Sequence, residues 1–329
     1  MFAPRQVLQT ALRAIVALAF AGVTAGAGAQ SYPSKPVRLI IGFSPGAAVD
    51  TVSRTLGTGL GAVLGQSVIM ENKPGAAGIV GNEYVAKAAP DGYTLLAGVT
   101  APFAIVPNLN AKLSYDPIRD YAPVAPFARS ASVLVVNASL PVKSVKEFIA
   151  YAKERPNRLN YASNGNGGLL HMGMEMFMSM AGIRMTHVPY NNLPLALQHV
   201  ASGELQAMFI SPTNAMPLVQ AGRLRALGIN TSSRSQLVPN IPTLDEEGLK
   251  GLNFSVWYGL FAPAGTPRPV INVLNAAVNT ALQQPEIVAR LKTSAAERFP
   301  GTPEDLGALV RAELQMYGRV ARAIGLQKQ

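Results

Sequence analysis

A nearly continuous apolar run from Val37 to Phe43 is followed by a short turn of small residues and then by a helical pattern. Such a run is typical of a strand that is buried on both faces of a parallel sheet. The turn, Ser44 to Ala48, leads into a segment whose apolar residues recur on one helical face, namely Val52, Leu56, Leu60, Val63 and Leu64. A helix that begins directly after a strand directs unpaired N–H groups and a positive dipole end toward the edge of the sheet. The pattern therefore predicts an anion site at this turn, with an ordinary strand-to-helix connection as the alternative.

The same alternation of strand and helix continues along the chain. Apolar runs predict further strands, and amphipathic segments between them predict helices. The expected strands span residues 67–71, 94–98, 132–136, 159–162, 185–189, 205–210 and 225–230, and the expected helices begin near residues 79, 145, 169, 194, 215, 270 and 303. This order indicates an α/β fold of right-handed βαβ units with parallel sheets, in which ligands bind beyond the carboxyl ends of the strands.

A glycine-rich loop, Ser163 to Gly168, repeats the first turn in the second half of the chain. It follows one expected strand and precedes an expected helix from Leu169 to Met180. Two helix N-termini that face one another would hold an anionic ligand from both sides. The loop lacks the spacing of G-x-G-x-x-G, and the sequence contains no G-x-x-x-x-G-K-[ST], so neither nucleotide-binding motif is present. The alternative is that these glycines serve only the geometry of the backbone.

The composition excludes several classes of site. The sequence has no cysteine, which excludes disulfides, thiolate metal sites and a catalytic thiol. Its three histidines, His171, His187 and His199, are far apart and no H-E-x-x-H occurs, so we expect neither a metal nor a cofactor. The formal net charge is +10, but only 14% of the residues are charged and the cations are scattered. A solvated basic surface is therefore expected rather than a nucleic-acid interface.

The first 30 residues have the features of an export signal. Arg5 and Arg13 form a positive region, residues 14–25 are apolar and small, and Ala27-Gly28-Ala29 offers a cleavage site. Cleavage after Ala29 is expected, with Ala25-Gly26-Ala27 as the alternative site; it removes two arginines and no acids, so the formal charge falls from +10 to +8. Because no later stretch has about 18 uninterrupted apolar residues, we expect a mature protein that is soluble and exported. An uncleaved membrane anchor is the alternative.

Eight short motifs occur in order along the mature chain: Tyr32-Pro33-Ser34-Lys35-Pro36; Phe43-Ser44-Pro45-Gly46 with Asp50; Glu71 to Gly78; Asp91-Gly92-Tyr93-Thr94-Leu95; His187-Val188-Pro189-Tyr190; Gln220 to Leu227; Pro239 to Thr243; and Ala262 to Pro267. Together they resemble the Bug family, the periplasmic substrate-binding proteins of tripartite tricarboxylate transporters. The resemblance covers the whole mature chain. It is specific for the family and says little about the ligand.

The resemblance implies a two-domain periplasmic binding protein of type II-like architecture, with a ligand cleft between two domains that each hold a mostly parallel sheet. The implied division is a signal peptide over residues 1–29, a first domain over residues 30–130 plus 254–329, and a second domain over residues 131–253. It further implies a monomer, not an enzyme, that captures a small carboxylate or dicarboxylate for the permease subunits of the transporter. A ligand sensor that signals to a kinase is the alternative within the same fold.

The candidate ligand-binding residues lie on the turns and strand ends described above. The resemblance places family contacts on the loops after the first and third strands and on the glycine loop. Around these loops, Tyr190 and Asn191 end a strand, His171 lies in the first helical turn, and Trp257 is near the return crossing, where a role in the cleft and burial in the core are equally expected. The full set is Phe43, Ser44, Gly46, Ala47, Ala48, Asp50, Thr100, Ala101, Ser163, Asn164, Gly165, Asn166, Gly168, His171, Tyr190, Asn191, Ile210, Ser211 and Trp257.

Two departures from the family pattern bear on the ligand. The family commonly reads P-G-G-x-x-D where this chain has Pro45-Gly46-Ala47-Ala48-Val49-Asp50, so a methyl group stands beside the turn in place of the second glycine. Where the family often has V-D-L-M-F-D-N, this chain has Gln206 and Ile210 in place of the two aspartates. The pocket is therefore expected to be less acidic and more apolar, and its ligand is expected to be a carboxylate without an amine.

A secreted α/β hydrolase is the competing function from another class. It has little support, because the sequence contains no G-x-S-x-G and offers no serine, histidine and acid to which roles can be assigned.

Overall fold

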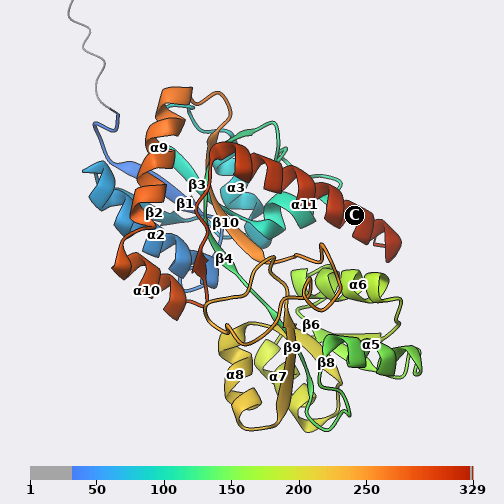
Figure 1. Ribbon diagram of the computed structural model, residues 1–329. Helices are drawn as coiled ribbons and strands as arrows, with labels where there is room; N and C mark the ends of the chain where they lie inside the picture. The colour runs from blue at the N-terminus through green and yellow to red at the C-terminus, as the bar shows by residue number, and fades with distance from the viewer. Residues whose placement is uncertain (1–31, 327, 329) are drawn as a thin grey trace, which may run out of the picture. The chain divides into compact units, whose positions relative to one another are not determined.

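The computed structural model describes residues 32–326 and 328 (Figure 1). The expected export signal and both of its candidate cleavage sites lie outside the described residues. From Lys35 onward the chain packs as one compact unit that contains two β-sheets, each with helices against it. Among the described residues, no helix combines the length and the apolar composition that a membrane span requires.

The first sheet has six strands in the order β11-β4-β10-β3-β1-β2. Its strands are β1 (Val37–Ile41), β2 (Val68–Asn72), β3 (Thr94–Val99), β4 (Tyr121–Ser130), β10 (Val256–Pro263) and β11 (Glu297–Arg298). The strands β1, β2 and β3 pair in parallel, whereas β10 pairs antiparallel with both β3 and β4, and β11 antiparallel with β4.

Helices pack against the first sheet and against one another. They are α2 (Ala48–Leu64), α3 (Ile79–Ala86), α4 (Val106–Leu109), α9 (Arg268–Ala281), α10 (Pro285–Thr293) and α11 (Pro303–Ala323), together with the short turns η1 (Ala76–Gly78) and η2 (Ala101–Ile105). The helix α2 packs against α9 and α10, while α11 packs against β4 and η2 (Figure 1). A capping box opens α11, because Thr302 accepts the Asp305 amide and Asp305 accepts the Thr302 amide.

The second sheet has five strands in the order β7-β6-β8-β5-β9. Its strands are β5 (Val133–Asn137), β6 (Asn160–Ser163), β7 (Thr186–Pro189), β8 (Ala207–Ile210) and β9 (Leu224–Ile229), and its helices are α5 (Val145–Lys153), α6 (Leu169–Ala181), α7 (Leu193–Ser202) and α8 (Pro212–Gln220). The strand β6 pairs in parallel with β7 and β8, whereas β5 pairs antiparallel with β8 and β9.

These sheets confirm the α/β class and correct one of its details. The expected mostly parallel sheets are mixed, because the chain passes from β4 in the first sheet to β5 in the second and returns through β10, and all three strands pair antiparallel with their neighbours. The strands β4 and β10 and the helix α10 were not among the expected elements. Two prolines, Pro123 and Pro126, interrupt the pattern of β4. The apolar run of β10 and the apolar residues four apart in α10, Ile287 and Leu291, are local signals that the sequence analysis did not use.

The expected loops over residues 99–102 and 211–214 are partly helical. The first passes into η2 at Ala101, and the chain continues into α4; in the second, α8 begins at Pro212 rather than near residue 215, so that Ser211 is the residue before its first turn. Proline at the first helical positions explains both, because its fixed φ angle suits a helix start and its missing N–H needs no partner there.

One hydrophobic cluster connects the two sheets. It contains Met174 and Phe177 from α6, Ala104 from η2, and Tyr317 and Ala321 from α11. The C-terminal helix thus packs on a helix of the second sheet as well as on the first sheet. The predicted division into two domains, 30–130 plus 254–329 and 131–253, stays a prediction.

Candidate functional site

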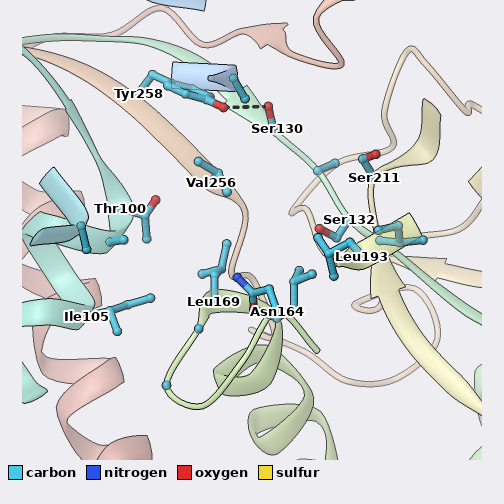
Figure 2. A pocket seen from close by; sticks show the side chains of 18 of the residues that line it. Thr100, Ile105, Ser130, Ser132, Asn164, Leu169, Leu193, Ser211, Val256 and Tyr258 are labelled. Carbon is cyan, nitrogen blue, oxygen red and sulfur yellow. Dashed lines mark hydrogen bonds between the residues drawn. The ribbon is translucent and has the colours of Figure 1, made fainter. Parts of the chain in front are cut away.

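A cavity of about 840 Å³ lies beyond the carboxyl ends of strands from both sheets. Figure 2 shows Thr100 and Ile105 on one side of it, Asn164 and Leu169 below, and Ser132 and Ser211 on the opposite side. Its lining consists of Ala48, Ala77, Thr100, Ala101, Ile105, Val106, Leu109, Asn110, Ser130, Ala131, Ser132, Asn164, Asn166, Gly167, Gly168, Leu169, Leu170, Leu193, Ile210, Ser211, Asn214, Val256, Tyr258, Ser294 and Ala295. A volume of this size suits a small organic ligand.

The part of the chain that the structure describes brings no charged side chain to the cavity. Within the described residues, its lining contains no Asp, Glu, Lys, Arg or His. The polar side chains are hydroxyls and amides, among them Ser130 and Tyr258, whose oxygens lie 3.4 Å apart (Figure 2). A charged ligand therefore meets only uncharged groups in this lining. For an anion, the main partners are backbone N–H groups and helix dipoles.

Several helices begin at the cavity wall, α2, α6 and α8 among them. Ala48 opens α2, Leu169 opens α6, and Ser211 precedes α8. Within the described residues, no acceptor is hydrogen-bonded to the amides of Ala48, Val49 and Asp50 in α2, or to the amide of Leu169 in α6. The first amides of a helix point out along its axis, so α2 and α6 each direct unpaired donors and a positive dipole end toward the cavity.

The glycine loop at the start of α6 is held by its own side chains. The Asn164 Oδ1 atom accepts the Leu170 amide at 3.1 Å, which leaves the Asn164 side-chain NH₂ free to face the cavity (Figure 2). Gly168 lies against this side chain, since a Cβ atom at Gly168 would be 2.7 Å from Asn164 Cγ. The Gly167 amide donates to His171 Nδ1 at 3.0 Å. These contacts fix the backbone of the loop and the Asn164 donor; Asn166 of the same loop also lines the cavity.

Two stacked histidines support this loop from behind. The rings of His171 and His187 are 4.0 Å apart and 9° from parallel, and His187 Nε2 is 2.6 Å from Ser163 Oγ. His171 Nε2 faces Glu175 at 3.7 Å. Burial lowers the pKa of His171 against the opposing effect of Glu175, and burial together with the neighbouring His171 lowers the pKa of His187 to about 4. Both rings are therefore neutral at pH 7, as the Gly167 amide requires of its acceptor.

We expect this stack to make the protein less stable in acid. Because both pKa values are lowered by folding, the unfolded chain binds more protons below about pH 6.5, and stability falls as the pH drops from there toward 4. A His187→Gln variant, which keeps a polar partner for Ser163, should show a shallower loss of melting temperature between pH 7 and pH 4. His199→Gln is the control, since His199 packs against Tyr190 and not against this stack. Equal slopes for the two variants would contradict the prediction.

The turn after β1 is occupied by its own hydrogen bonds. Asp50 accepts bonds from the Gly46 amide, from Arg54 Nε and from Asn72 Nδ2. Burial alone would raise the pKa of Asp50, but these three donors outweigh it and lower the pKa, so the carboxylate is ionised and satisfied within α2 and β2. Asp50 therefore stabilises the turn and the first residues of its own helix, and the Gly46 amide is not available to a ligand.

A family comparison places the chain among known proteins. The model of the tripartite tricarboxylate transporter family receptor matches residues 52–326. The chain belongs to this family. Receptors of this family are periplasmic solute-binding proteins and not enzymes. The comparison confirms the resemblance that the sequence motifs indicated.

Relatives and solved structures cover nearly the whole receptor. Protein BugT of Bordetella pertussis is 33% identical over 319 residues, 96% of this chain and 98% of that protein. The structure of R. palustris Rpa4515 with adipate has a TM-score of 0.71 at 32% identity and covers 91% of this chain and 100% of the other. That of MatC from Rhodopseudomonas palustris with bound malate has a TM-score of 0.67 at 33% identity and covers 88% and 99%.

Eight of the predicted site residues line the cavity of this receptor. They come from all three predicted loops and from the end of β8, and they are Ala48, Thr100, Ala101, Asn164, Asn166, Gly168, Ile210 and Ser211. The departure at Ile210 is among them and contributes apolar atoms to the wall, whereas Ala47, which stands in place of the second glycine of P-G-G-x-x-D, does not line the cavity. The other predicted residues do not line it: Phe43, Ser44, Gly46, Ala47, Asp50, Ser163, Gly165, His171, Tyr190, Asn191 and Trp257.

Three aromatic residues of the predicted set are held by side-chain contacts and do not line the cavity, and Trp257 takes the buried one of its two expected positions. The Trp257 ring is buried in the core and donates from Nε1 to Glu313 at 2.6 Å, so it does not cover the cavity. The Tyr190 hydroxyl bonds His199 Nδ1 at 2.7 Å, and His171 is held between Gly167 and His187. In each case a partner on another element determines the direction of the ring.

Many of the lining residues that sequence reasoning missed fall into three groups. The apolar wall formed by Ile105, Val106 and Leu109 follows from the unexpected helices η2 and α4. Residues 130–132, Val256 and Tyr258 lie at the two crossings, whose positions the sequence analysis predicted without assigning them to the site. Ser294 and Ala295 follow α10, and no local signal marks them.

The structure also bears on the hydrolase alternative. Ser163 and His187 form a serine–histidine pair, but the Ser163 side chain is fully buried and its oxygen also accepts the Gly165 amide. A nucleophile must reach its substrate, so this pair supports the loop and offers no accessible attacking oxygen.

Proposed function

We propose that this receptor captures a small carboxylate without an amine group in the described cavity and delivers it to the membrane subunits of a tripartite tricarboxylate transporter. The observation that carries the proposal is the absence of charged side chains from the described lining, combined with unpaired amides at the starts of α2 and α6. Such a site stabilises negative charge and has nothing with which to balance positive charge.

An amino-acid ligand would place an ammonium group in this cavity. Burying an ammonium group without an anionic partner costs several kcal/mol. The nearest predicted candidate, Asp50, is already bonded to Arg54, Asn72 and Gly46, and Ile210 stands where many relatives carry aspartate. We therefore propose that amines are excluded by the cost of desolvation rather than by size.

The apolar wall indicates the body of the ligand. Ile105, Val106, Leu109, Leu169 and Leu193 line the cavity opposite or beside the amides. An aliphatic or aromatic chain against these side chains would gain about 25 cal/mol for each Å² of apolar surface removed from water. Adipate, bound by the related Rpa4515, is a carboxylate with such a chain, whereas malate, bound by MatC, is shorter and more polar.

The proposed location and partners of this receptor are those that its family implies. We propose a mature chain that begins near Gln30 after export to the periplasm, works as a monomer, and meets integral membrane permease subunits there. A sensor that presents the same ligand to a kinase shares every feature of the cavity, and no feature of the described residues favours it.

A thermal-shift panel tests the ligand class. At about one hundred times its dissociation constant, a ligand adds roughly 2.7 kcal/mol to the stability of the native state, which raises the melting temperature by several degrees. We expect adipate and longer or aromatic carboxylates to give such a shift, and aspartate and glutamate to give none at the same concentration. A shift with aspartate or glutamate and none with any amine-free acid would overturn the proposal.

A further inference from the structure

Three hydroxyl groups line the ligand cavity where the chain crosses between the two sheets. Ser130 and Ser132 lie at the first crossing, from β4 to β5, and Tyr258 lies in β10 at the return crossing. Figure 2 shows Ser130 and Tyr258 across the cavity from Asn164 and Leu169 at the start of α6. These three crossing hydroxyls therefore belong to a different part of the lining from the α6 amide.

The Ser132 hydroxyl is buried and has no partner in the described part of the chain. Ser132 is 7% exposed, it lines the cavity, and only its backbone takes part in hydrogen bonds. A buried hydroxyl without a partner costs free energy, and the large majority of buried polar side chains in native proteins have one. Because this hydroxyl borders the cavity, a bound ligand can supply the missing partner.

Asn230 holds the backbone of Ser132 in place. The Ser132 amide donates to Asn230 Oδ1 at 2.7 Å, and the Asn230 amide donates to the Ser132 carbonyl at 3.0 Å. Asn230 directly follows β9 and is fully buried. Since both backbone groups of Ser132 are bonded to Asn230, the side chain is the part of Ser132 that is left for a ligand.

The other two crossing hydroxyls are bonded only loosely to each other. The oxygens of Ser130 and Tyr258 are 3.4 Å apart, which is longer than the usual separation of about 2.7–2.8 Å between two hydroxyls. Either hydroxyl can donate in this contact, so the hydrogen of the other has no acceptor among the described residues. Burial raises the pKa of Tyr258 against the opposing effect of Ser130, so the phenol keeps its proton. The pair therefore offers one free O–H group.

The surroundings of Ser132 favour an uncharged ligand group over a second carboxylate. Ser211 lies beside Ser132 (Figure 2) and precedes α8, but the first residue of α8, Pro212, has no N–H, and the Asn214 and Ala215 amides are bonded to the Ser211 carbonyl at 3.1 Å. The start of α8 therefore offers an anion less than the starts of α2 and α6 do. A hydroxyl both donates and accepts, so it can match an alcohol or carbonyl oxygen without the cost of burying a charge.

We propose that Ser132 and the Ser130–Tyr258 pair bind an uncharged oxygen of the ligand, so that the receptor prefers a carboxylate with a hydroxyl or keto group to the same acid without it. This inference rests on the proposed function, because it takes the carboxylate itself to lie at the unpaired amides of α2 or α6. Those amides select for a carboxylate, whereas Ser132 and Tyr258 select among carboxylates. Asn230 positions Ser132 for this contact.

Calorimetry with matched acids on the purified mature receptor tests the inference. Adipate is compared with 2-hydroxyadipate and 3-hydroxyadipate, which between them place a hydroxyl on every methylene of the chain, and hexanoate is compared with 6-hydroxyhexanoate. We expect at least one hydroxylated acid to bind the wild type at least tenfold more tightly than its parent, because a site built to bond a hydroxyl discriminates against the ligand that lacks it. Ser132→Ala and Tyr258→Phe should each reduce this ratio at least threefold.

Ser53→Ala and Tyr317→Phe are the matched controls. Each removes a buried hydroxyl that also has no partner among the described residues but does not line the cavity, so the ratio should stay within twofold of the wild type. An equal reduction in the controls would overturn the inference, and so would hydroxylated acids that bind no more tightly than their parents. If Ser132→Ala and Tyr258→Phe instead weaken adipate relative to hexanoate, the crossing hydroxyls bind a second carboxylate and the assignment to an uncharged oxygen is wrong.

The same measurements separate this inference from the proposed function. A wild type that binds the parent and hydroxylated acids equally well refutes only the role of the crossing hydroxyls. A wild type that binds none of these acids, nor any other carboxylate without an amine, refutes the function itself. Circular dichroism of the four variants confirms that they are folded.

Discussion

Replacing Gly168 by alanine should weaken carboxylate binding at least tenfold while leaving the receptor folded. The added Cβ would lie 2.7 Å from Asn164 Cγ, and closer still to Oδ1, so the Asn164 side chain must move. That movement breaks the bond from the Leu170 amide and turns the free NH₂ away from the cavity. A lost hydrogen bond to a charged ligand is worth roughly 1.5–3 kcal/mol, and each 1.4 kcal/mol is a factor of ten in affinity. The measurement is the dissociation constant of adipate by calorimetry.

Gly307→Ala provides the matched control for this change. Gly307 lies within α11, where an added Cβ meets nothing closer than 3.3 Å and the nearest atom is the end of the flexible Arg311 side chain. Alanine in a helix is favourable, so this variant should bind adipate like the wild type. If Gly168→Ala binds as tightly as Gly307→Ala, the glycine loop does not hold the ligand.

Replacing Glu313 by glutamine should stabilise the receptor, and the gain should grow as the pH rises. Glu313 lies in α11 and is 7% exposed; burial raises its pKa to about 8, although the bond from Trp257 Nε1 acts in the opposite direction. Between pH 4.5 and 8 the folded protein keeps a proton that the unfolded chain releases, so stability falls as the pH rises through this range. A difference of about 3.5 pH units corresponds to roughly 5 kcal/mol once the pH exceeds 8. Glutamine removes this loss and keeps an oxygen for Trp257.

Urea unfolding at pH 5, 7 and 9 measures the effect. The stabilities of Glu313→Gln and the wild type should be close at pH 5 and should diverge progressively toward pH 9. Glu286→Gln, which changes an exposed glutamate of α10, shows what the loss of a surface carboxylate does by itself. A constant difference between Glu313→Gln and the wild type at all three pH values would show that Glu313 does not carry its proton in the folded state.

Much of the fold could be predicted because its signals are local. The apolar run before Ser44, the small-residue turn, and the glycine loop before Leu169 each specify a strand end and a helix start within a few residues, and α2 and α6 begin where these signals place them. The strand β4 is interrupted by two prolines, and the apolar run of β10 does not by itself say where in the sheet the strand pairs. Their place in the sheet comes from pairing with each other across more than a hundred residues of sequence.

The candidate site, like the fold, has features that the sequence predicts and features that only the tertiary structure decides. The sequence by itself determined that small residues and helix N-termini meet beyond the strand ends, and that Ile210 replaces a family aspartate, because both follow from residue identity and short-range order. Only the tertiary structure decided which donors remain free: Gly46 is taken by Asp50, Trp257 by Glu313, and Tyr190 by His199. It also decided that η2 and α4 supply the apolar wall. The physical reason is that a polar group bonds to the nearest partner that packing brings to it, and for Trp257 that partner is 56 residues away along the chain.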